Sequence, residues 1–374
     1  MVIADINRKR LLKTFTDLLK INSPSFQEKE IGDHLSKLLR ERGCRVITQK
    51  YDRSFNIIAH KKGNISKGRT LLLSAHMDTI EPTEGIAFRT EDNRVCSTGN
   101  TVLGADDKSA IAQIIEAMTV LQEQSMPHDD IEIVFTSAEE KGLHGAKNLD
   151  FRKIKSRHAL VLDSGGPVGK IVVAAPAHIT YEMRITGRPA HAGIEPEKGI
   201  SAIRVASEII AAVPDGRIDA VTTANIGLIR GGTATNVVPR EVIVNGEVRS
   251  HSPVTLRATK NAVFDKAKGI VRKRNAAVHI KAHEEYRAFR ISRKEPFLAF
   301  MDAVFLNVHI RPEHAITGGG SDANIFNQHG IVALNLSTGM QKVHSHDEFI
   351  HIDDLVKGSL VIALAVRDFG KFRR

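Results

Sequence analysis

Short apolar runs alternate with segments of helical periodicity along most of this 374-residue chain. Four runs, at 71–73, 131–135, 159–162 and 331–334, are too short for helices, so we interpret them as buried strands. Between the first two runs, residues 110–121 place apolar side chains at helical spacing. Buried strands connected by helices form a mostly parallel sheet covered on both faces. The sequence therefore predicts an α/β fold.

The central part of the chain has a different pattern. Its expected strands alternate apolar and polar residues, which is typical of strands with one solvated face. The elements expected there are strands at 180–186, 222–229 and 242–248 and helices at 200–213 and 253–274. From residue 294 the α/β pattern returns. We therefore expect a discontinuous larger domain, 1–176 and 290–374, that carries an inserted smaller α+β domain, 177–289.

Charge and composition exclude several classes of protein. Lys and Arg outnumber Asp and Glu, 53 to 43, but aromatic residues make up only 5% of the chain, which disfavours binding by base stacking. We interpret the basic stretch 266–281 as a solvated helix face and expect no nucleic-acid partner. The two cysteines, Cys44 and Cys96, exclude a disulfide framework and a Cys-rich zinc module. Residues 1–10 lack the apolar core of a secretory signal. The apolar run 360–366 is far shorter than the roughly 20 residues that a membrane span needs. We therefore expect a cytoplasmic protein without a membrane partner.

Acidic and histidine residues follow the predicted strands, where ligands gather in open α/β sheets. The candidates are His76 and Asp78 after the first run, Asp106 and Asp107 before the next helix, Glu139 and Glu140 after the second run, Asp163 after the third, and His344 and His346 after the fourth. Imidazole nitrogen and carboxylate oxygen suit divalent zinc, manganese or cobalt. Two ions about 3.5–4 Å apart can share a carboxylate, whereas a single ion would leave several acids crowded together.

Each of these motifs also has a simpler interpretation. A His-x-Asp pair can be a surface pair, two acids before a helix can cap it, and Asp163 can begin a turn. Their convergence on strand ends favours a metal site. On an extended stretch, residues two apart point the same way, so Asp78 can accept the free N–H of His76. Glu139 and Glu140 are adjacent and diverge, so one can bind a metal while the other takes a proton.

Motifs along nearly the whole chain resemble those of the M20 family of dinuclear metallopeptidases, and within it the peptidase T-like branch. The matching stretches occur in the family's order: SAHMDT at 74–79, GADDKSA at 104–110, SAEEKGLHGAK at 137–147, VLDSGGPVG at 161–169, GRPAHAG at 187–193, GGTATNVVP at 231–239, GGGSDAN at 318–324 and HSHDE at 344–348.

The resemblance implies two divalent metal ions held by five side chains. His76 and Asp163 would bind one ion, Glu140 and His344 would bind the other, and Asp106 would bridge the two. Zinc is the expected metal, with cobalt and manganese as alternatives.

Two details of this ligand set also come from the resemblance. The last histidine ligand normally stands four residues before a glutamate, here Glu348, which selects His344 and leaves His346 as the alternative. The peptide bond between Asp106 and Asp107 is expected to be cis.

The inserted domain would be a lid and dimerisation domain, which implies a homodimer. In it, His191 would reach the substrate carbonyl, often across a dimer, Asn236 would contact the substrate, and Arg249 would hold a substrate carboxylate. Ser321 would line the pocket, although a small residue there fits a helix N-terminus equally well.

The expected activity is hydrolysis of short peptides, and above all removal of the first residue of tripeptides. A metal-bridged hydroxide would attack the peptide carbonyl, with Glu139 as general acid/base and Asp78 orienting His76. Many relatives carry an Asp where this chain has Ala138, so an N-acyl-amino-acid deacylase or a carboxypeptidase with the same dinuclear site remains the alternative. A basic nucleic-acid-binding protein is the distant alternative.

Overall fold

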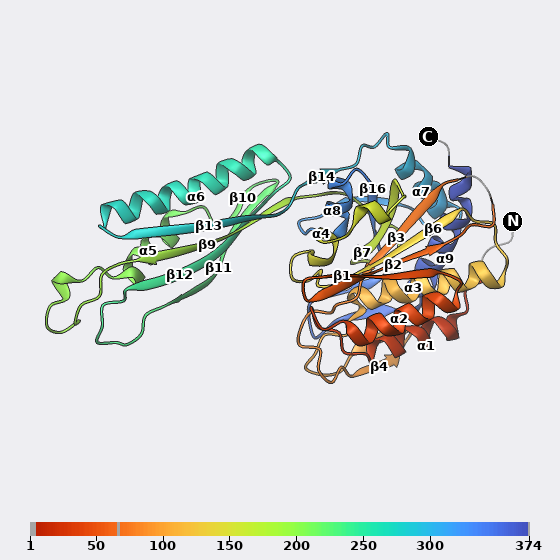
Figure 1. Cartoon of the computed structure of the whole chain (residues 1–374), viewed down its shortest axis with the longest axis horizontal. Helices are drawn as coiled ribbons and strands as arrows, with labels where there is room; N and C mark the ends of the chain where they lie inside the picture. The colour runs from red at the N-terminus through yellow and green to blue at the C-terminus, as the bar shows by residue number, and fades with distance from the viewer. Residues whose placement is uncertain (1–4, 66–67, 373–374) are drawn as a thin grey trace. The chain divides into compact units, whose positions relative to one another are not determined.

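The computed structural model describes residues 5–65 and 68–372. Residues 1–4, part of the segment 1–10 that we expect to lack a secretory signal, lie outside the described residues. The chain forms two compact units. The larger unit is assembled from both ends of the chain, Met1–Val173, Arg290–Ile316 and Ser321–Arg374, and the smaller one comprises Ala174–Phe289 and Thr317–Gly320. A mixed α/β unit with a separate small sheet unit confirms the predicted fold class (Figure 1).

A nine-stranded sheet forms the centre of the larger unit. Four neighbouring strands, in the order β6-β3-β7-β16, run parallel, and β1, β2 and β8 join them antiparallel at the two sides. The strands are β1 (Arg45–Tyr51), β2 (Ser54–Lys61), β3 (Thr70–His76), β6 (Asp130–Thr136), β7 (His158–Ser164), β8 (Lys170–Ala175), β14 (Phe289–Arg290), β15 (Glu313–Ile316) and β16 (Val332–Ser337). The four parallel strands therefore end at one common edge.

Helices cover this sheet and supply most of the buried residues of its core. The apolar faces of α1, α2, α3, α7 and α9 pack against one another and against the sheet, while α4 and α8 contact β2, β7 and β16. The helices are α1 (Arg8–Leu19), α2 (Lys29–Glu41), α3 (Ala105–Glu123), α4 (His144–Lys147), α7 (Pro296–Leu306), α8 (Asp322–Gln328) and α9 (Ile352–Asp368). Helix α2 ends at Glu41, and Gly43 follows two residues later with φ of 73°, an angle that suits a residue without a side chain.

A small four-stranded sheet of the same unit carries the C-terminal part of the candidate site. Its order is β17-β18-β5-β4, so that segments far apart in the sequence lie side by side. The strands are β4 (Phe88–Glu91), β5 (Arg94–Ser97), β17 (Met340–Gln341) and β18 (Phe349–His351). The pairing of β18 with β5 brings the 342–348 loop toward the start of α3.

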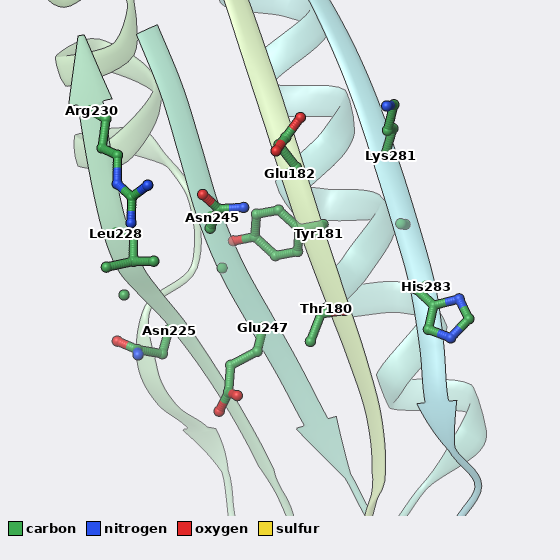
Figure 2. A pocket seen from close by; sticks show the side chains of 13 residues that line it. Thr180, Tyr181, Glu182, Asn225, Leu228, Arg230, Asn245, Glu247, Lys281 and His283 are labelled. Atoms are coloured by element: carbon green, nitrogen blue, oxygen red, sulfur yellow. The ribbon is translucent and has the colours of Figure 1, made fainter. Parts of the chain in front are cut away.

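The smaller unit is a five-stranded antiparallel sheet with two helices on one face. Strand order is β10-β11-β12-β9-β13, and apolar residues on alternate positions pack against α5 and α6. The elements are β9 (Ala177–Thr186), α5 (Ala202–Ala212), β10 (Gly216–Asp219), β11 (Thr222–Gly231), β12 (Glu241–Ser250), α6 (Pro253–Lys273) and β13 (Ala277–Tyr286). The other face carries polar side chains, among them Glu182, Asn245 and Lys281, which line a cavity of about 670 Å³ (Figure 2).

None of the described helices is both long enough and apolar enough to cross a lipid bilayer.

Candidate metal centre

The common edge of the parallel strands carries the predicted acidic and histidine residues. His76 is the last residue of β3, and Glu139 and Glu140 follow the end of β6. Asp163 lies inside β7 instead of in a turn, because β7 continues to Ser164, which pairs with β16. The simpler interpretation, in which Asp163 only begins a turn, is therefore wrong, and the residue lies near the end of the strand.

Asp106 and Asp107 open α3, but neither caps it. The N-cap is Gly104, with φ of 81°, and both aspartates have non-helical backbone angles. Their peptide bond is cis, as the resemblance implied. Asp107 is fully buried, and its Oδ2 accepts the backbone N–H of His76 over 3.1 Å. This contact ties the end of β3 to the start of α3.

Asp106 presents its two carboxylate oxygens to two different histidines. Oδ1 lies 3.0 Å from Nε2 of His76, and Oδ2 lies 3.3 Å from Nε2 of His344. His76 Nε2 is also 3.9 Å from Oδ1 of Asp163, and His344 Nε2 is 2.9 Å from Oε1 of Glu140. The five predicted ligands thus form two clusters, one around each histidine, with Asp106 in both.

The ring of His76 is fixed from its other nitrogen. Nδ1 lies 2.9 Å from the main-chain oxygen of Asp78 and 3.4 Å from its Oδ1. A carbonyl oxygen can only accept, so Nδ1 donates to Asp78. Nε2 faces the carboxylate of Asp106, to which it donates here and beside which it could instead bind a cation. Asp78 thus contacts Nδ1 of His76 through both its backbone and its carboxylate, and the backbone contact is the closer one.

The carboxylate of Asp78 holds the loop that follows β6. Its Oδ1 accepts the N–H of Glu139 over 2.9 Å, and its Oδ2 accepts the N–H of Glu140 over 3.2 Å and the hydroxyl of Ser25 over 2.7 Å. The two glutamates diverge: donor atoms of Glu140 group with His76 and Asp106, whereas those of Glu139 group with His76 and Asp163.

The carboxylates at this edge are buried close together, so their charged forms repel one another. Burial, reinforced by the charge of Asp163, raises the pKa of Glu139 well above its usual range. Burial and the charge of Asp106 do the same to the pKa of Asp163. Burial would also raise the pKa of Asp106, but hydrogen bonds from His344 and His76 lower it, and hydrogen bonds to Asp106 and Glu140 raise the pKa of His344 to about 10.

These side chains fit divalent cations. In each of two groups, His76–Asp106–Glu140 and His76–Glu139–Asp163, the donor atoms all lie within 4.8 Å of one another. Nitrogen and oxygen donors at such distances suit zinc, cobalt or manganese. A divalent cation would also reverse the repulsion that raises the carboxylate pKa values, because it favours their charged forms.

Residue Glu348 contributes to the centre in a way that sequence reasoning did not predict. It is 1% exposed, and its carboxylate accepts the backbone N–H groups of Leu103, Gly104 and Asp106 over 2.7, 2.8 and 3.0 Å. His344 and His346 are both exposed, but His344 contacts the carboxylates of Asp106 and Glu140. The only sequence signal for Glu348 was its fixed spacing from His344.

The predicted substrate-binding residues of the smaller unit occupy two ends of its sheet. His191 and Asn236 lie in adjoining exposed loops, joined by a hydrogen bond from Ala192 N to the main-chain oxygen of Asn236 over 2.9 Å. Arg249 lies near the opposite end of β12, where its guanidinium contacts Glu247 over 2.9 and 3.0 Å and the Tyr286 hydroxyl over 3.4 Å.

Ser321, in the larger unit, is the N-cap of α8. Its Oγ accepts the N–H of Ala323 over 3.3 Å and the side-chain amide of Asn335 over 3.1 Å, and Asn324 completes a capping box. The residue is buried. These contacts correspond to the helix-terminus interpretation.

Known proteins resemble this chain over nearly its whole length. A model of the peptidase family M20/M25/M40 matches residues 72–368. The uncharacterized protein YqjE of Bacillus subtilis (strain 168) is 38% identical, over 98% of this chain and 100% of that protein. The crystal structure of the aminopeptidase PepT from Bacillus cereus is 34% identical, with a TM-score of 0.88 over 97% of this chain and 99% of that one. A tripeptidase structure from Staphylococcus aureus is 31% identical, with a TM-score of 0.92 over 98% and 99% of the two chains. Because the family model spans most of the chain and these relatives cover nearly all of it, the chain belongs to the peptidase family M20/M25/M40 and is a metal-dependent peptidase.

Proposed function

We propose that this chain is a dinuclear aminopeptidase that removes the first residue of tripeptides. The observation that carries the proposal is Asp106, whose two oxygens face two separate histidines, as a carboxylate shared by two ions requires. The substrate class is supported by the aminopeptidase and the tripeptidase that are 34% and 31% identical to the chain.

In this proposal, His76 and Asp163 hold one ion, Glu140 and His344 hold the other, and Asp106 holds both. Zinc is the favoured metal, and cobalt and manganese suit the same donors. When bound, two such ions lower the pKa of water and polarise the scissile carbonyl.

Glu139 is the proposed general acid/base. Its side chain is only 9% exposed and groups with His76 and Asp163, and its N–H is held by Asp78. From there it accepts a proton from the attacking water and returns it to the leaving amine. The fixed backbone keeps the carboxylate within reach of both proton positions.

Two chains are proposed to share each active site through the smaller unit. Thr186 and His178 of β9 pair with Glu241 and Arg249 of β12, so the two ends of the sheet are eight residues apart, or roughly 26 Å at about 3.3 Å per residue. His191 lies beyond the first end, and Arg249 lies at the second. A tripeptide is too short to contact both in one chain, which supports a homodimer in which His191 and Asn236 serve the partner's site.

The test uses zinc-loaded protein and a tripeptide of three distinguishable residues, beside an N-acetylated copy, with products identified by mass spectrometry. Release of the first residue alone, with the blocked copy inert, is expected. Release of the last residue would indicate a carboxypeptidase, and removal of the acetyl group would indicate a deacylase. Either result would overturn the aminopeptidase assignment while keeping the metal centre.

A further inference from the structure

We propose that Glu28 is a positioning residue that holds the backbone of the loop carrying Glu139 and Glu140. The inference rests on the proposed function, in which Glu139 is the general acid/base. Glu28 lies more than a hundred residues earlier in the chain, directly before α2, and is 1% exposed.

Three consecutive backbone N–H groups of this loop donate to carboxylates. The N–H of Ala138 donates to Oε1 of Glu28 over 2.8 Å, and those of Glu139 and Glu140 donate to Asp78 over 2.9 and 3.2 Å. Asp78 therefore accepts two of these three N–H groups, and Glu28 accepts the third. Since Ala138 directly precedes both glutamates, its contact with Glu28 fixes the position of the backbone just before them.

The segment 25–28 is anchored at both of its ends to the same site. The hydroxyl of Ser25 donates to Oδ2 of Asp78 over 2.7 Å, while Glu28 binds Ala138. The segment thus joins the two carboxylates that hold the loop, and displacement of Glu28 would also disturb Asp78.

Two residues in the left-handed region depend on Glu28. Phe26 has φ of 70° and Ala138 has φ of 49°, a region that is unfavourable for a residue with a side chain. Both donate their N–H groups to the same atom, Oε1 of Glu28, over 2.9 and 2.8 Å. Loss of this one acceptor would allow both turns to relax to ordinary backbone angles.

Glu28 is an expensive residue to bury at this position. Its donors are two backbone amides and the Ser54 hydroxyl, which lies 3.3 Å from Oε2, and all three are neutral. Burial raises the pKa of Glu28, and the charge of Asp78 adds to the effect. The hydrogen bonds that Glu28 accepts offset the cost of its burial, and an apolar side chain of the same size would leave the N–H groups of Phe26 and Ala138 without an acceptor.

Glu132 offers a matched control within the same unit. It is also 1% exposed, and its carboxylate accepts the N–H groups of Lys155 and Ser156 over 2.9 and 3.0 Å. It lies on β6, four residues before the end of the strand, and it holds the backbone of a different loop, at 155–156. Its loss should lower stability in the same way as loss of Glu28 without moving Glu139.

The test compares Glu28→Ala, Glu28→Gln and Glu132→Ala as zinc-loaded proteins. We expect Glu28→Ala to lower kcat about 10–100-fold with KM changed less than threefold, as other outer residues of metal sites do. Glu28→Gln should retain kcat within about threefold, because its oxygen can replace Oε1 and its amide can donate to Ser54. Glu132→Ala should retain kcat although it is destabilised.

Hydrogen exchange measured by mass spectrometry gives a second readout that needs no substrate. In Glu28→Ala the amides of 138–140 should exchange faster, whereas in Glu132→Ala the faster exchange should lie at 155–156. If Glu28→Ala does not fold, Glu28→Asp, which withdraws the acceptor by one methylene, should show the same loss of kcat. Unchanged exchange at 138–140, or unchanged kcat in a folded Glu28→Ala or Glu28→Asp, would overturn the proposal. A wild-type protein that leaves tripeptides intact would refute the proposed function alone, because the exchange test would still apply.

Discussion

Replacement of Asp78 by asparagine removes one charge and exchanges one acceptor oxygen for a donor. In the wild-type protein Asp78 is fully buried, and its carboxylate accepts hydrogen bonds from the Ser25 hydroxyl and the amides of Glu139 and Glu140. Nδ1 of His76 also lies 3.4 Å from Oδ1. Burial alone would raise its pKa, but hydrogen bonds, first from His76, lower it, so the native state favours the carboxylate.

The expected cost follows from this count of donors. An amide keeps one acceptor oxygen, so one of the two loop N–H groups, of Glu139 or Glu140, must face an NH₂ group. A buried N–H without an acceptor costs about 1–3 kcal/mol, and the remaining bond to the loop loses about 1 kcal/mol with its charge. The hydroxyl of Ser25 can rotate to accept instead. We therefore expect Asp78→Asn to lower the free energy of unfolding by about 3 kcal/mol.

The same change should reduce activity, because the loop carries Glu139. We expect kcat to fall about 10–100-fold. Denaturant titration measures the stability, and turnover of a tripeptide at saturating metal measures kcat. The control is Glu132→Gln, which makes the same chemical change in a buried carboxylate that binds backbone amides elsewhere, and it should lose stability while retaining kcat. A stable Asp78→Asn protein would refute the hydrogen-bond reasoning, and an unstable one with normal kcat would refute the positioning role.

Three further predictions address other parts of the molecule. Glu139→Gln should bind both metals, as measured by elemental analysis, and lose about 10²–10⁴-fold in kcat, and near-normal turnover by the loaded protein would contradict its role. In metal-free protein, burial raises the pKa of Asp322 from 3.8 to about 6, so its charge opposes folding as the pH rises through this range. Asp322→Asn should therefore stabilise the metal-free protein by about 2.5 kcal/mol more at pH 8 than at pH 4 in denaturant titrations, and an equal effect at both pH values would contradict this sign. An equimolar mixture of Glu139→Gln and His191→Ala that has exchanged subunits should regain about one quarter of wild-type kcat, because half of the dimers would hold one intact site. Absence of recovery would contradict the shared site.

The fold was predictable where hydrophobic periodicity is strong. The runs at 71–73 and 131–135 became β3 and β6, because strands buried on both faces admit few polar residues. The hairpin of β1 and β2 was not predicted. Half of β1 is solvated, and β2 buries the polar Asn56, whose amide donates to the main-chain oxygen of Gly145 over 2.8 Å. Polar residues satisfied by a distant loop leave no periodic signal.

At the candidate site, residue types were predictable but the path of the backbone was not. Parallel strands end at one edge, so the approach of His76 and Asp163 follows from topology. The left-handed angles of Phe26, Ala138 and His344, with φ of 70°, 49° and 61°, could not be anticipated, because none of them is a glycine. Tertiary hydrogen bonds hold at least the first two in place, and such contacts are invisible in one sequence.

The four-residue spacing between His344 and Glu348 has a physical reason in this structure. Both residues act on Asp106: His344 Nε2 approaches its Oδ2 at 3.3 Å, and Glu348 Oε1 accepts its N–H over 3.0 Å. The intervening chain turns back on itself, with the N–H of Glu348 donating to the main-chain oxygen of Ser345 over 3.2 Å. The segment thus positions both the side chain and the backbone of Asp106. Moving either His344 or Glu348 by one position in the sequence should therefore break one of these two contacts.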